Sequence, residues 1–375
     1  MLLRPVPFTI CPRFPMISAD AARPPPPALV ATLPIETLRA LAILVLVSFH
    51  VIGGPEAGRG LALSYPHPLR HYADLMIDVR MPVFAFIAGA VYGMRPVAPA
   101  QLGVFLTGKL RRLALPGITA ITVFLLMATA MHTPEGIIHR PWDAYLRHYG
   151  IFWFLQVMLV IFATYGTLDV LTRGRALMPA LVLSLVALAA GWRFDSDIMA
   201  LKRVTHLLAY FLLGLAFMRH LDRVMAHRRP AAAVALVALA LGLGLNLLVL
   251  ARTGAYSAER LDLQSLLFGT GACVAGMLLL PRLRWLQWLG AFSLTIYLYH
   301  ILATSMMRRV LAGAGVDLPW VQVLAGTVAG IALPVLLHLV CLRWPVTRLM
   351  VLGLRPRDGR RDQPRGASLA AAGRV

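Results

Sequence analysis

The sequence predicts an all-α, polytopic integral membrane protein with about ten transmembrane helices and both termini in the cytoplasm. Composition is the first observation behind this fold, since 59% of the 375 residues are apolar and only 14% are charged. Soluble domains are nearer to about 45–50% apolar and about 25% charged. The second observation is that the apolar residues form long runs. Crossing a bilayer takes about 20 apolar residues per helix, and a helix satisfies its own backbone polar groups in lipid.

Charges, prolines and glycines delimit ten apolar runs along the chain. The predicted helices lie at 35–53, 74–94, 113–132, 150–171, 177–193, 204–219, 231–251, 263–280, 288–307 and 319–342. The proline-rich residues 1–32 and the arginine-rich residues 346–375 lack a sustained apolar core, and we expect both to be disordered cytoplasmic tails. Residues 33–345 then form one membrane domain.

The distribution of Lys and Arg predicts the orientation of the helices. If the N-terminus is cytoplasmic, 23 of the 36 basic residues fall on the inner side and 11 on the outer side. Basic residues concentrate in cytoplasmic loops, so this orientation is favoured. Arg39 and Arg80 are the two basic residues that lie inside predicted helices.

The net charge of +20 could suggest a nucleic-acid-binding protein. The charges lie in short loops between apolar runs and in the basic C-terminal tail. They do not alternate with aromatic residues as on a nucleic-acid-binding surface. We therefore expect a lipid bilayer, and not a nucleic acid, as the environment of this chain.

The first predicted helix, 35–53, carries Arg39 and His50 eleven positions apart. Eleven steps of about 100° place both side chains on one face, separated by about 16 Å along the axis. Ionisable residues inside spans are costly and usually functional. Glu36 can pair with Arg39 one turn away. Arg39 could alternatively extend to the lipid headgroups, but a histidine as deep as His50 needs a polar partner.

The second predicted helix, 74–94, has Asp74, Asp78 and Arg80 near its outer end. Because this helix runs inward, Asp78 and Arg80 should lie at a depth similar to that of His50. Pro82 leaves a backbone carbonyl without its helical partner there. A purely structural ion pair between the first two helices is the alternative. Gly89 is expected to allow close helix packing.

Other polar or aromatic residues near predicted spans are weaker candidates. Lys109 and Arg112, in the inner loop before the third helix, satisfy the positive-inside rule but could also clamp a polyphosphate. Trp153 opens the fourth helix, where aromatic residues commonly form an interfacial belt. Tyr297 and His300 are i,i+3 neighbours on one face of the ninth helix. His206 and His338 are more simply hydrogen-bonded packing residues.

Several short stretches resemble the motifs of the acyltransferase-3 family of bacterial membrane acyltransferases. Its members include O-antigen and exopolysaccharide O-acetylases, Nod-factor acetylases and periplasmic-glucan succinylases. The matching stretches are Arg39 with His50, RMPVFAFIAG (80–89), KLRRLALP (109–116), WFL (153–155) and IYLYH (296–300). Each motif is short, but five in the same order and spacing are fairly specific. Two positions depart from the pattern: Ile151 replaces a frequent histidine and Ala88 replaces a serine.

The resemblance implies a multi-pass protein of the bacterial inner membrane with acyltransferase activity. The expected reaction transfers an acyl group, acetyl in the simplest case, from cytoplasmic acyl-CoA to a hydroxyl of an extracytoplasmic or lipid-linked glycan. No bound cofactor or metal is expected, with acyl-CoA acting as co-substrate. Arg39 and His50 would be the essential pair, and Lys109 and Arg112 would bind the donor.

A mechanism can be written on these expectations. His50 would act as general base on the sugar hydroxyl, Asp78 would orient its imidazole, and Arg80 would stabilise the oxyanion or hold the acceptor. A covalent acyl-histidine relay is equally compatible with the sequence. The competing class is a transporter or flippase, in which Asp78, Arg80 and the histidines line a path; a sensory or structural protein is a third. No paired, broken-helix repeat typical of transporters was found.

Overall fold

The protein is built from α-helices, as predicted. The computed structural model describes residues 24–54, 60–130, 142–147, 149–257 and 260–355, and this part of the chain contains no β-strand. The longer helices are α2 (Ile35–Ile52), α4 (Ile77–Gly93), α6 (Leu115–Ala130), α8 (Trp153–Leu171), α9 (Leu177–Ala189), α10 (Val204–Arg219), α12 (Arg228–Thr253), α13 (Leu263–Leu279), α15 (Ser293–Gly313) and α16 (Pro319–Cys341). The shorter helices are α1 (Pro27–Val30), α3 (Pro68–Leu75), α5 (Leu102–Lys109), α7 (Asp143–Leu146), α11 (Leu221–Ala226), α14 (Arg284–Gly290) and α17 (Pro345–Met350).

The helices are long and apolar enough for a multi-pass membrane protein. Seven stretches of the described chain could cross a bilayer, or eight if α14 and α15, which meet at an angle of 76°, form one bent span. The other two predicted spans correspond to α9, with 13 residues, and α13, with 17. Both are shorter than the roughly 20 residues of a straight span. Each predicted apolar run therefore contains a helix, while ten spans and their orientation stay predictions.

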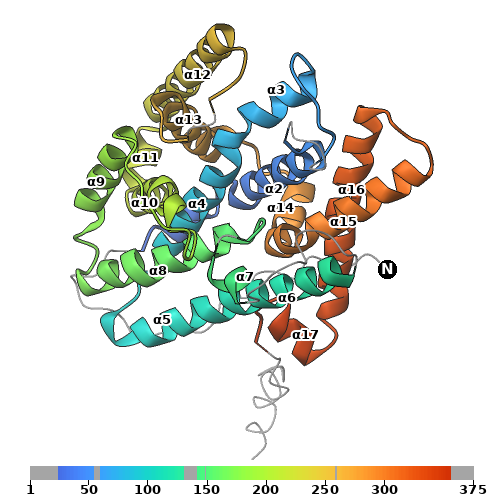
Figure 1. Ribbon diagram of the computed structural model, residues 1–375. Helices are drawn as coiled ribbons and strands as arrows, with labels where there is room; N and C mark the ends of the chain where they lie inside the picture. The colour runs from blue at the N-terminus through green and yellow to red at the C-terminus, as the bar shows by residue number, and fades with distance from the viewer. Residues whose placement is uncertain (1–23, 55–59, 131–141, 148, 258–259, 356–375) are drawn as a thin grey trace, which may run out of the picture.

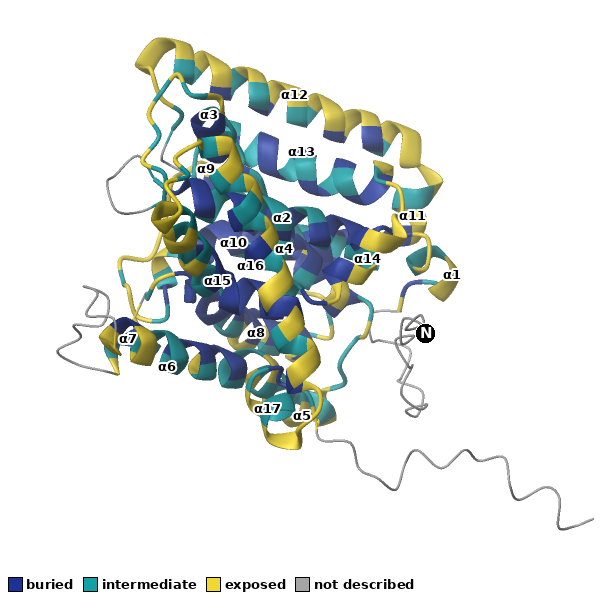
Figure 2. Cartoon of the chain, turned by 90° about the vertical axis from the view of Figure 1, so that its right-hand side faces the viewer, coloured by how far each residue is buried: buried dark blue, intermediate teal, exposed yellow. Residues whose placement is uncertain are grey.

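The central helix of the bundle is α2. It packs against α4, α14, α15 and α16 (Figure 1). Buried residues concentrate on α2, α4, α10 and α15, whereas α12 presents a largely exposed surface at the periphery (Figure 2). Exposed apolar side chains of α12, such as Val234, Val237 and Leu241, suit contact with lipid. Asp78 and Arg80 of α4 are thus enclosed by other helices.

Two glycines bring α4 and α10 into close contact. A side chain at Gly89 of α4 would overlap the carbonyl oxygen of Phe211, and one at Gly214 of α10 would overlap that of Phe86. Small residues at helix crossings in membranes allow backbones to approach in this way. The packing role expected for Gly89 is confirmed, and it fixes α4, with Asp78 and Arg80, against α10.

Replacing Gly89 by alanine should destabilise the protein. Because the overlapping atom belongs to the backbone of Phe211, the helices must separate, and overpacking of this kind costs about 1–3 kcal/mol. Gly244 of α12 is the matched control, since a side chain there meets no atom within 4 Å among the described residues. Gly244→Ala should be neutral or stabilising by about 0.5–1 kcal/mol. Thermal unfolding in detergent measures both, and equal midpoints for the two variants would contradict this explanation.

A buried ion pair joins the C-terminal ends of α8 and α10. Arg219 donates to both carboxylate oxygens of Asp169 at 2.9 and 2.6 Å, and Tyr92 of α4 donates to the same carboxylate at 2.8 Å. The exposed fractions of the Arg219 and Asp169 side chains are only 9% and 4%. Three helices are therefore tied together at this end by hydrogen bonds to one carboxylate.

The terminal segments are described only in part. Most of the predicted tails, at 1–23 and 356–375, lies outside the described residues. Within the remainder, α1 and α17 are short helices in segments for which disorder is predicted. Both have proline at the first or second helical position, where the missing N–H costs no hydrogen bond. α17 also packs against α6, a contact that the local sequence does not indicate.

Candidate active site

The helix α2 connects two ends of the bundle that differ in chemistry. Arg39 lies in its first turns and His50 near its end. Since the helix is continuous, eleven positions correspond to about 16 Å along the axis. α4 begins near His50, because Arg80 of α4 contacts Phe49. We refer to the two ends of the bundle as the His50 end and the Arg39 end.

His50 lies against a second histidine, His300 of α15. The two ring centroids are 5.0 Å apart, and His300 has no exposed surface. Nδ1 of His300 is 3.0 Å from the carbonyl oxygen of Ile296 and 2.9 Å from that of Tyr297. A carbonyl only accepts hydrogen bonds, so Nδ1 carries the proton and Nε2 has the lone pair. No described residue hydrogen-bonds to this buried Nε2. The structure thus brings together two histidines that the sequence singled out separately.

Arg80 is also buried beside His50. Its guanidinium carbon lies 3.2 Å from the centroid of the Phe49 ring, and the Phe49 ring contacts His50 edge-on at 5.1 Å. One guanidinium nitrogen, NH1, is buried and has no hydrogen-bond partner among the described residues. The Phe49 ring covers one face of the Arg80 guanidinium and orients the group. The N–H groups at the edge of the guanidinium stay available for a ligand.

Asp78 lies at the same end of the bundle, but its carboxylate faces α12 and α13. Ser265 of α13 and Asn246 of α12 lie beside its carboxylate. No contact between Asp78 and His50 occurs in the described chain, where the neighbour of the imidazole is His300. The backbone oxygen of Asp78, left without a helical partner by Pro82, lies against Gly269 of α13. The neighbours of the Asp78 carboxylate are therefore on α12 and α13. The predicted role of orienting the His50 imidazole would require a contact with His50 instead.

Trp153 and Tyr297 connect the site to α8 and α10. Trp153 is 9% exposed and lies under the guanidinium of Arg203, whose carbon is 4.2 Å from the ring centroid. Trp153 is therefore a buried ring that stacks under the cation of Arg203, and not an exposed aromatic residue of an interfacial belt. Tyr297 donates its hydroxyl hydrogen bond to the carbonyl of Ile151, and its ring lies 6.4 Å from that of His300. Phe154 contacts the rings of both Trp153 and Tyr297, so a row of aromatic rings links Arg203 to His300.

Five of the eleven buried polar atoms without partners among the described residues lie toward the His50 end. They are Asp78 Oδ1, Arg80 NH1, Thr205 Oγ1, His206 Nε2 and His300 Nε2. More than nine in ten buried polar groups in proteins are hydrogen-bonded, so such a group of exceptions needs an explanation. Binding of a polar substrate that completes these hydrogen bonds is the explanation we favour.

Arg70 fixes the end of α2 that carries His50. This arginine, only 1% exposed, donates to the carbonyl of Gly53 at 2.6 Å and forms an ion pair with Asp74. Gly53 ends α2 with a φ of 70°, a left-handed value that suits glycine. The tertiary contact from α3 therefore holds the last turn of α2, including His50, in place.

The predicted donor-binding residues are spread over the Arg39 end. Arg39 donates to both oxygens of Glu36 at 2.7 and 2.8 Å, as expected from their spacing. Lys109 Nζ lies 3.5 Å from the centroid of the Phe162 ring, and Arg112 is exposed. No contact joins Arg39 to Lys109 or Arg112 in the described residues. The binding of one donor molecule by all three residues therefore stays a prediction.

Three residues near Arg80, at the His50 end, are not among the site residues predicted from the sequence. They are Arg203, His206 and Arg260. The two arginines count as loop charges in the sequence, and His206 as a packing residue. Burial lowers the pKa of the Arg260 guanidinium below its usual value, and the nearby Asp78 carboxylate opposes this change. His338, by contrast, hydrogen-bonds to Thr295 at 2.7 Å, as a packing residue should. The only indication of Arg203 and Arg260 in the sequence is that each stands just before an apolar run, where a side chain can reach the end of a helix bundle.

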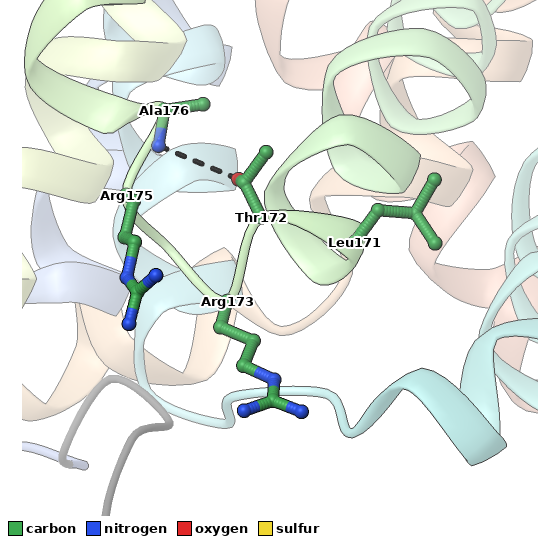
Figure 3. A pocket seen from close by; sticks show the side chains of 5 residues that line it. All are labelled: Leu171, Thr172, Arg173, Arg175 and Ala176. Carbon is green, nitrogen blue, oxygen red and sulfur yellow. Dashed lines mark hydrogen bonds between the residues drawn. The ribbon is translucent and has the colours of Figure 1, made fainter.

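An open depression of about 480 Å³ lies elsewhere, at the C-terminal end of α8. Its lining residues are Leu171, Thr172, Arg173, Arg175 and Ala176. Figure 3 shows that the two arginines project from the turn between α8 and α9, where Ala176 N donates to Thr172 Oγ1 at 3.4 Å. None of the predicted site residues lines this depression, and no histidine or carboxylate does. The histidine pair is therefore the better candidate for the reaction centre.

Helices that suit a bilayer, together with a histidine pair beside a buried arginine that has no carboxylate partner among the described residues, define a membrane protein with an embedded polar site. Comparison with family models identifies the class of protein: the model described as an acyltransferase domain matches residues 34–339. The chain therefore belongs to the acyltransferase-3 family and is a membrane acyltransferase that transfers groups other than amino-acyl groups. Comparison with curated proteins gave no match. Comparison with solved structures gave none either.

Proposed function

We propose that the protein transfers an acyl group, acetyl in the simplest case, from cytoplasmic acyl-CoA to a hydroxyl of an extracytoplasmic or lipid-linked glycan. The contact between His50 and the fully buried His300 is the observation that carries this proposal. A buried imidazole with a free lone pair beside a second imidazole is suited to accept and return a proton. Both termini would be cytoplasmic, in the inner membrane of a bacterium.

His50 acts as the general base in the proposed reaction. It removes the proton from the acceptor hydroxyl while the hydroxyl oxygen attacks the thioester carbonyl carbon. The new C–O bond forms, the C–S bond breaks, and the proton passes from His50 to the leaving thiolate. The products are the glycan ester and free CoA. Arg80, stacked on Phe49 beside His50, has an unpaired N–H that can stabilise the negative charge on the carbonyl oxygen.

His300 positions His50 in this scheme. Its Nδ1 is held by two backbone carbonyls, so its Nε2 can accept a hydrogen bond from the His50 ring. This takes the place of the carboxylate that was expected from Asp78. The alternative is a relay in which the acyl group rests on His50 before it reaches the acceptor. A stable radiolabel on the protein after incubation with acyl-labelled donor and no acceptor would favour the relay.

Arg39, with Lys109 and Arg112, binds the phosphates of the donor in this proposal. The length of α2 between Arg39 and His50, about 16 Å, is close to the reach of an extended pantetheine arm. A donor held at the cytoplasmic surface could then present its thioester to the histidines inside the membrane. Family membership favours this enzyme over the transporter that the sequence left open.

Replacing Arg39 by alanine should weaken donor use. Loss of a charge-assisted contact with a phosphate corresponds to about 1.5–3 kcal/mol, so the KM for acetyl-CoA should rise at least about tenfold. Arg229, exposed at the start of α12, is the matched control, and Arg229→Ala should leave the KM unchanged. Initial rates of thiol release in proteoliposomes measure both. A KM for Arg39→Ala equal to that of the wild type would remove Arg39 from the donor site.

The full-length protein in liposomes, supplied with labelled acetyl-CoA and candidate glycans, tests the proposed function directly. Thiol release together with label on the glycan supports acyl transfer. Movement of glycan across the bilayer without thiol release would instead indicate transport and contradict the proposal.

A further inference from the structure

Three arginines from separate parts of the chain gather at the His50 end. Arg80 lies on α4, Arg203 immediately before α10, and Arg260 in the loop before α13. The charges of Arg203 and Arg260 act on Arg80, and the opposite charges of Asp74 and Asp78 offset them in part. Like charges repel, and this repulsion is stronger in a partly buried site than in water. Bringing three cations together in this way therefore has to be offset by another interaction.

Two other arginines with buried side chains, Arg70 and Arg219, are neutralised by carboxylates. Arg70 is paired with Asp74, and Arg219 with Asp169. None of the three clustered arginines has a carboxylate oxygen within 4.0 Å among the described residues, although Asp78 is near. The clustered arginines thus differ from Arg70 and Arg219, each of which has its own counter-ion.

Aromatic rings hold two of these arginines by their faces. Arg80 is stacked on Phe49 and Arg203 on Trp153. Stacking orients a guanidinium and leaves the N–H groups of its edge free for planar or tetrahedral oxyanions. Arg80 NH1 is such a group, being buried and without a partner among the described residues.

A further unpaired group belongs to the same cluster. His206 Nε2 is buried without a partner in the described chain, and the charges of Arg203 and Arg260 act on its ring. An anion bound here would offset the repulsion between the three cations and accept hydrogen bonds from their guanidinium groups. The cluster also lies next to the proposed reaction centre, because Phe49 contacts both Arg80 and His50.

We propose that Arg80, Arg203 and Arg260 form a subsite for an anionic group, a carboxylate or a phosphate, that one of the substrates carries. The proposal rests on the acyl-transfer function proposed above and narrows its substrate class. The anion could belong to the acyl group, as the free carboxylate of a succinyl chain does, or to the acceptor, as a uronic acid or a phosphorylated sugar. In both cases the arginines place the charged substrate beside His50 and select against neutral analogues.

The test compares Arg203→Gln and Arg260→Gln with the wild type, and Arg252→Gln is the matched control because Arg252 is exposed at the end of α12. Thiol release in proteoliposomes is inhibited with inorganic phosphate and with succinate at constant ionic strength. We expect the inhibitory concentrations to rise about tenfold in each cluster variant, as for the loss of one charge-assisted hydrogen bond, and to stay unchanged in the control.

The choice of donor separates the two sources of the anion. If the acyl group carries it, the wild type should use succinyl-CoA in preference to acetyl-CoA, and both cluster variants should lose this preference. If the acceptor carries it, the two donors should behave alike, while phosphate and succinate compete with the acceptor. Equal inhibition of the wild type and the cluster variants, with thiol release intact, would overturn the anionic subsite and leave the acyltransferase proposal standing.

A binding measurement covers the case in which neither donor is turned over. Because Arg203 lies over Trp153, phosphate binding should change the intrinsic fluorescence of the wild type, and Trp153→Phe should remove that change. The midpoint of the phosphate titration should rise about tenfold in Arg260→Gln. Absence of thiol release with every donor would contradict the proposed function. A fluorescence titration that is the same in Arg260→Gln as in the wild type would contradict the subsite.

Discussion

Replacing His50 by alanine should reduce acyl transfer by about 10²–10⁴-fold, since this is the usual contribution of a general base. The loss should appear in kcat, with little change in the KM for acyl-CoA, because His50 lies about 16 Å along α2 from Arg39. Stopped assays of thiol release and of acceptor labelling in proteoliposomes measure the effect.

His338→Ala provides the matched control for this prediction. His338 is a half-buried histidine of a spanning helix, but its ring is used in a hydrogen bond to Thr295. Its removal should affect stability more than turnover. If His50→Ala keeps wild-type rates of both thiol release and acceptor labelling, His50 is not the base. Equal losses in the two histidine variants would indicate a general effect on folding.

Replacing Asp169 by alanine should have the largest effect on stability. The change leaves Arg219 as an uncompensated, nearly buried charge, and breaking one side of such a pair costs about 3–5 kcal/mol. It also removes the acceptor of the Tyr92 hydroxyl. Because the carboxylate connects α4, α8 and α10, the expected result is a much lower unfolding midpoint in detergent.

The exposed pair of Asp143 and Arg147 supplies the control. Their side chains are 37% and 57% exposed, and surface pairs contribute only about 0–1 kcal/mol. Asp143→Ala should therefore hardly move the midpoint. The double variant Asp169→Leu with Arg219→Met should recover much of the loss, since an apolar pair of similar volume needs no counter-charge. A single Asp169→Ala variant as stable as the wild type would exclude a structural role for the pair.

Much of the fold follows from local features of the sequence. Each predicted apolar run contains a helix, and α2 and α10 match their predicted limits within one residue. Local spacing also predicts the Glu36–Arg39 pair correctly, because residues three apart face each other on a helix. The number of spans does not follow from the sequence, since α9 and α13 are shorter than the roughly 20 residues of a straight span and α14 bends away from α15.

The sequence identifies several residues of the candidate site, but it does not predict which of them contact one another. His50, His300 and Arg80 stand out because each is ionisable inside an apolar run. Their arrangement depends on how α2, α4 and α15 pack, which no local pattern encodes. For the same reason Asp78 was expected beside His50 although its neighbours are Ser265 and Asn246. The sequence does not predict the ion pair of Asp169 with Arg219, because the two residues are far apart along the chain.

The sequence alone determines that this chain is a helical membrane protein with ionisable residues inside its first two spans, and its motifs point to the acyltransferase family. Composition and periodicity suffice for this because lipid allows few ways to satisfy the backbone. Only the tertiary structure decides which ionisable groups meet. It pairs Asp169 with Arg219, puts His300 against His50, and leaves a buried nitrogen of Arg80 without a hydrogen-bond partner among the described residues. The physical reason is that a buried charge is stabilised by whatever lies within a few ångströms, and packing between distant helices sets that distance.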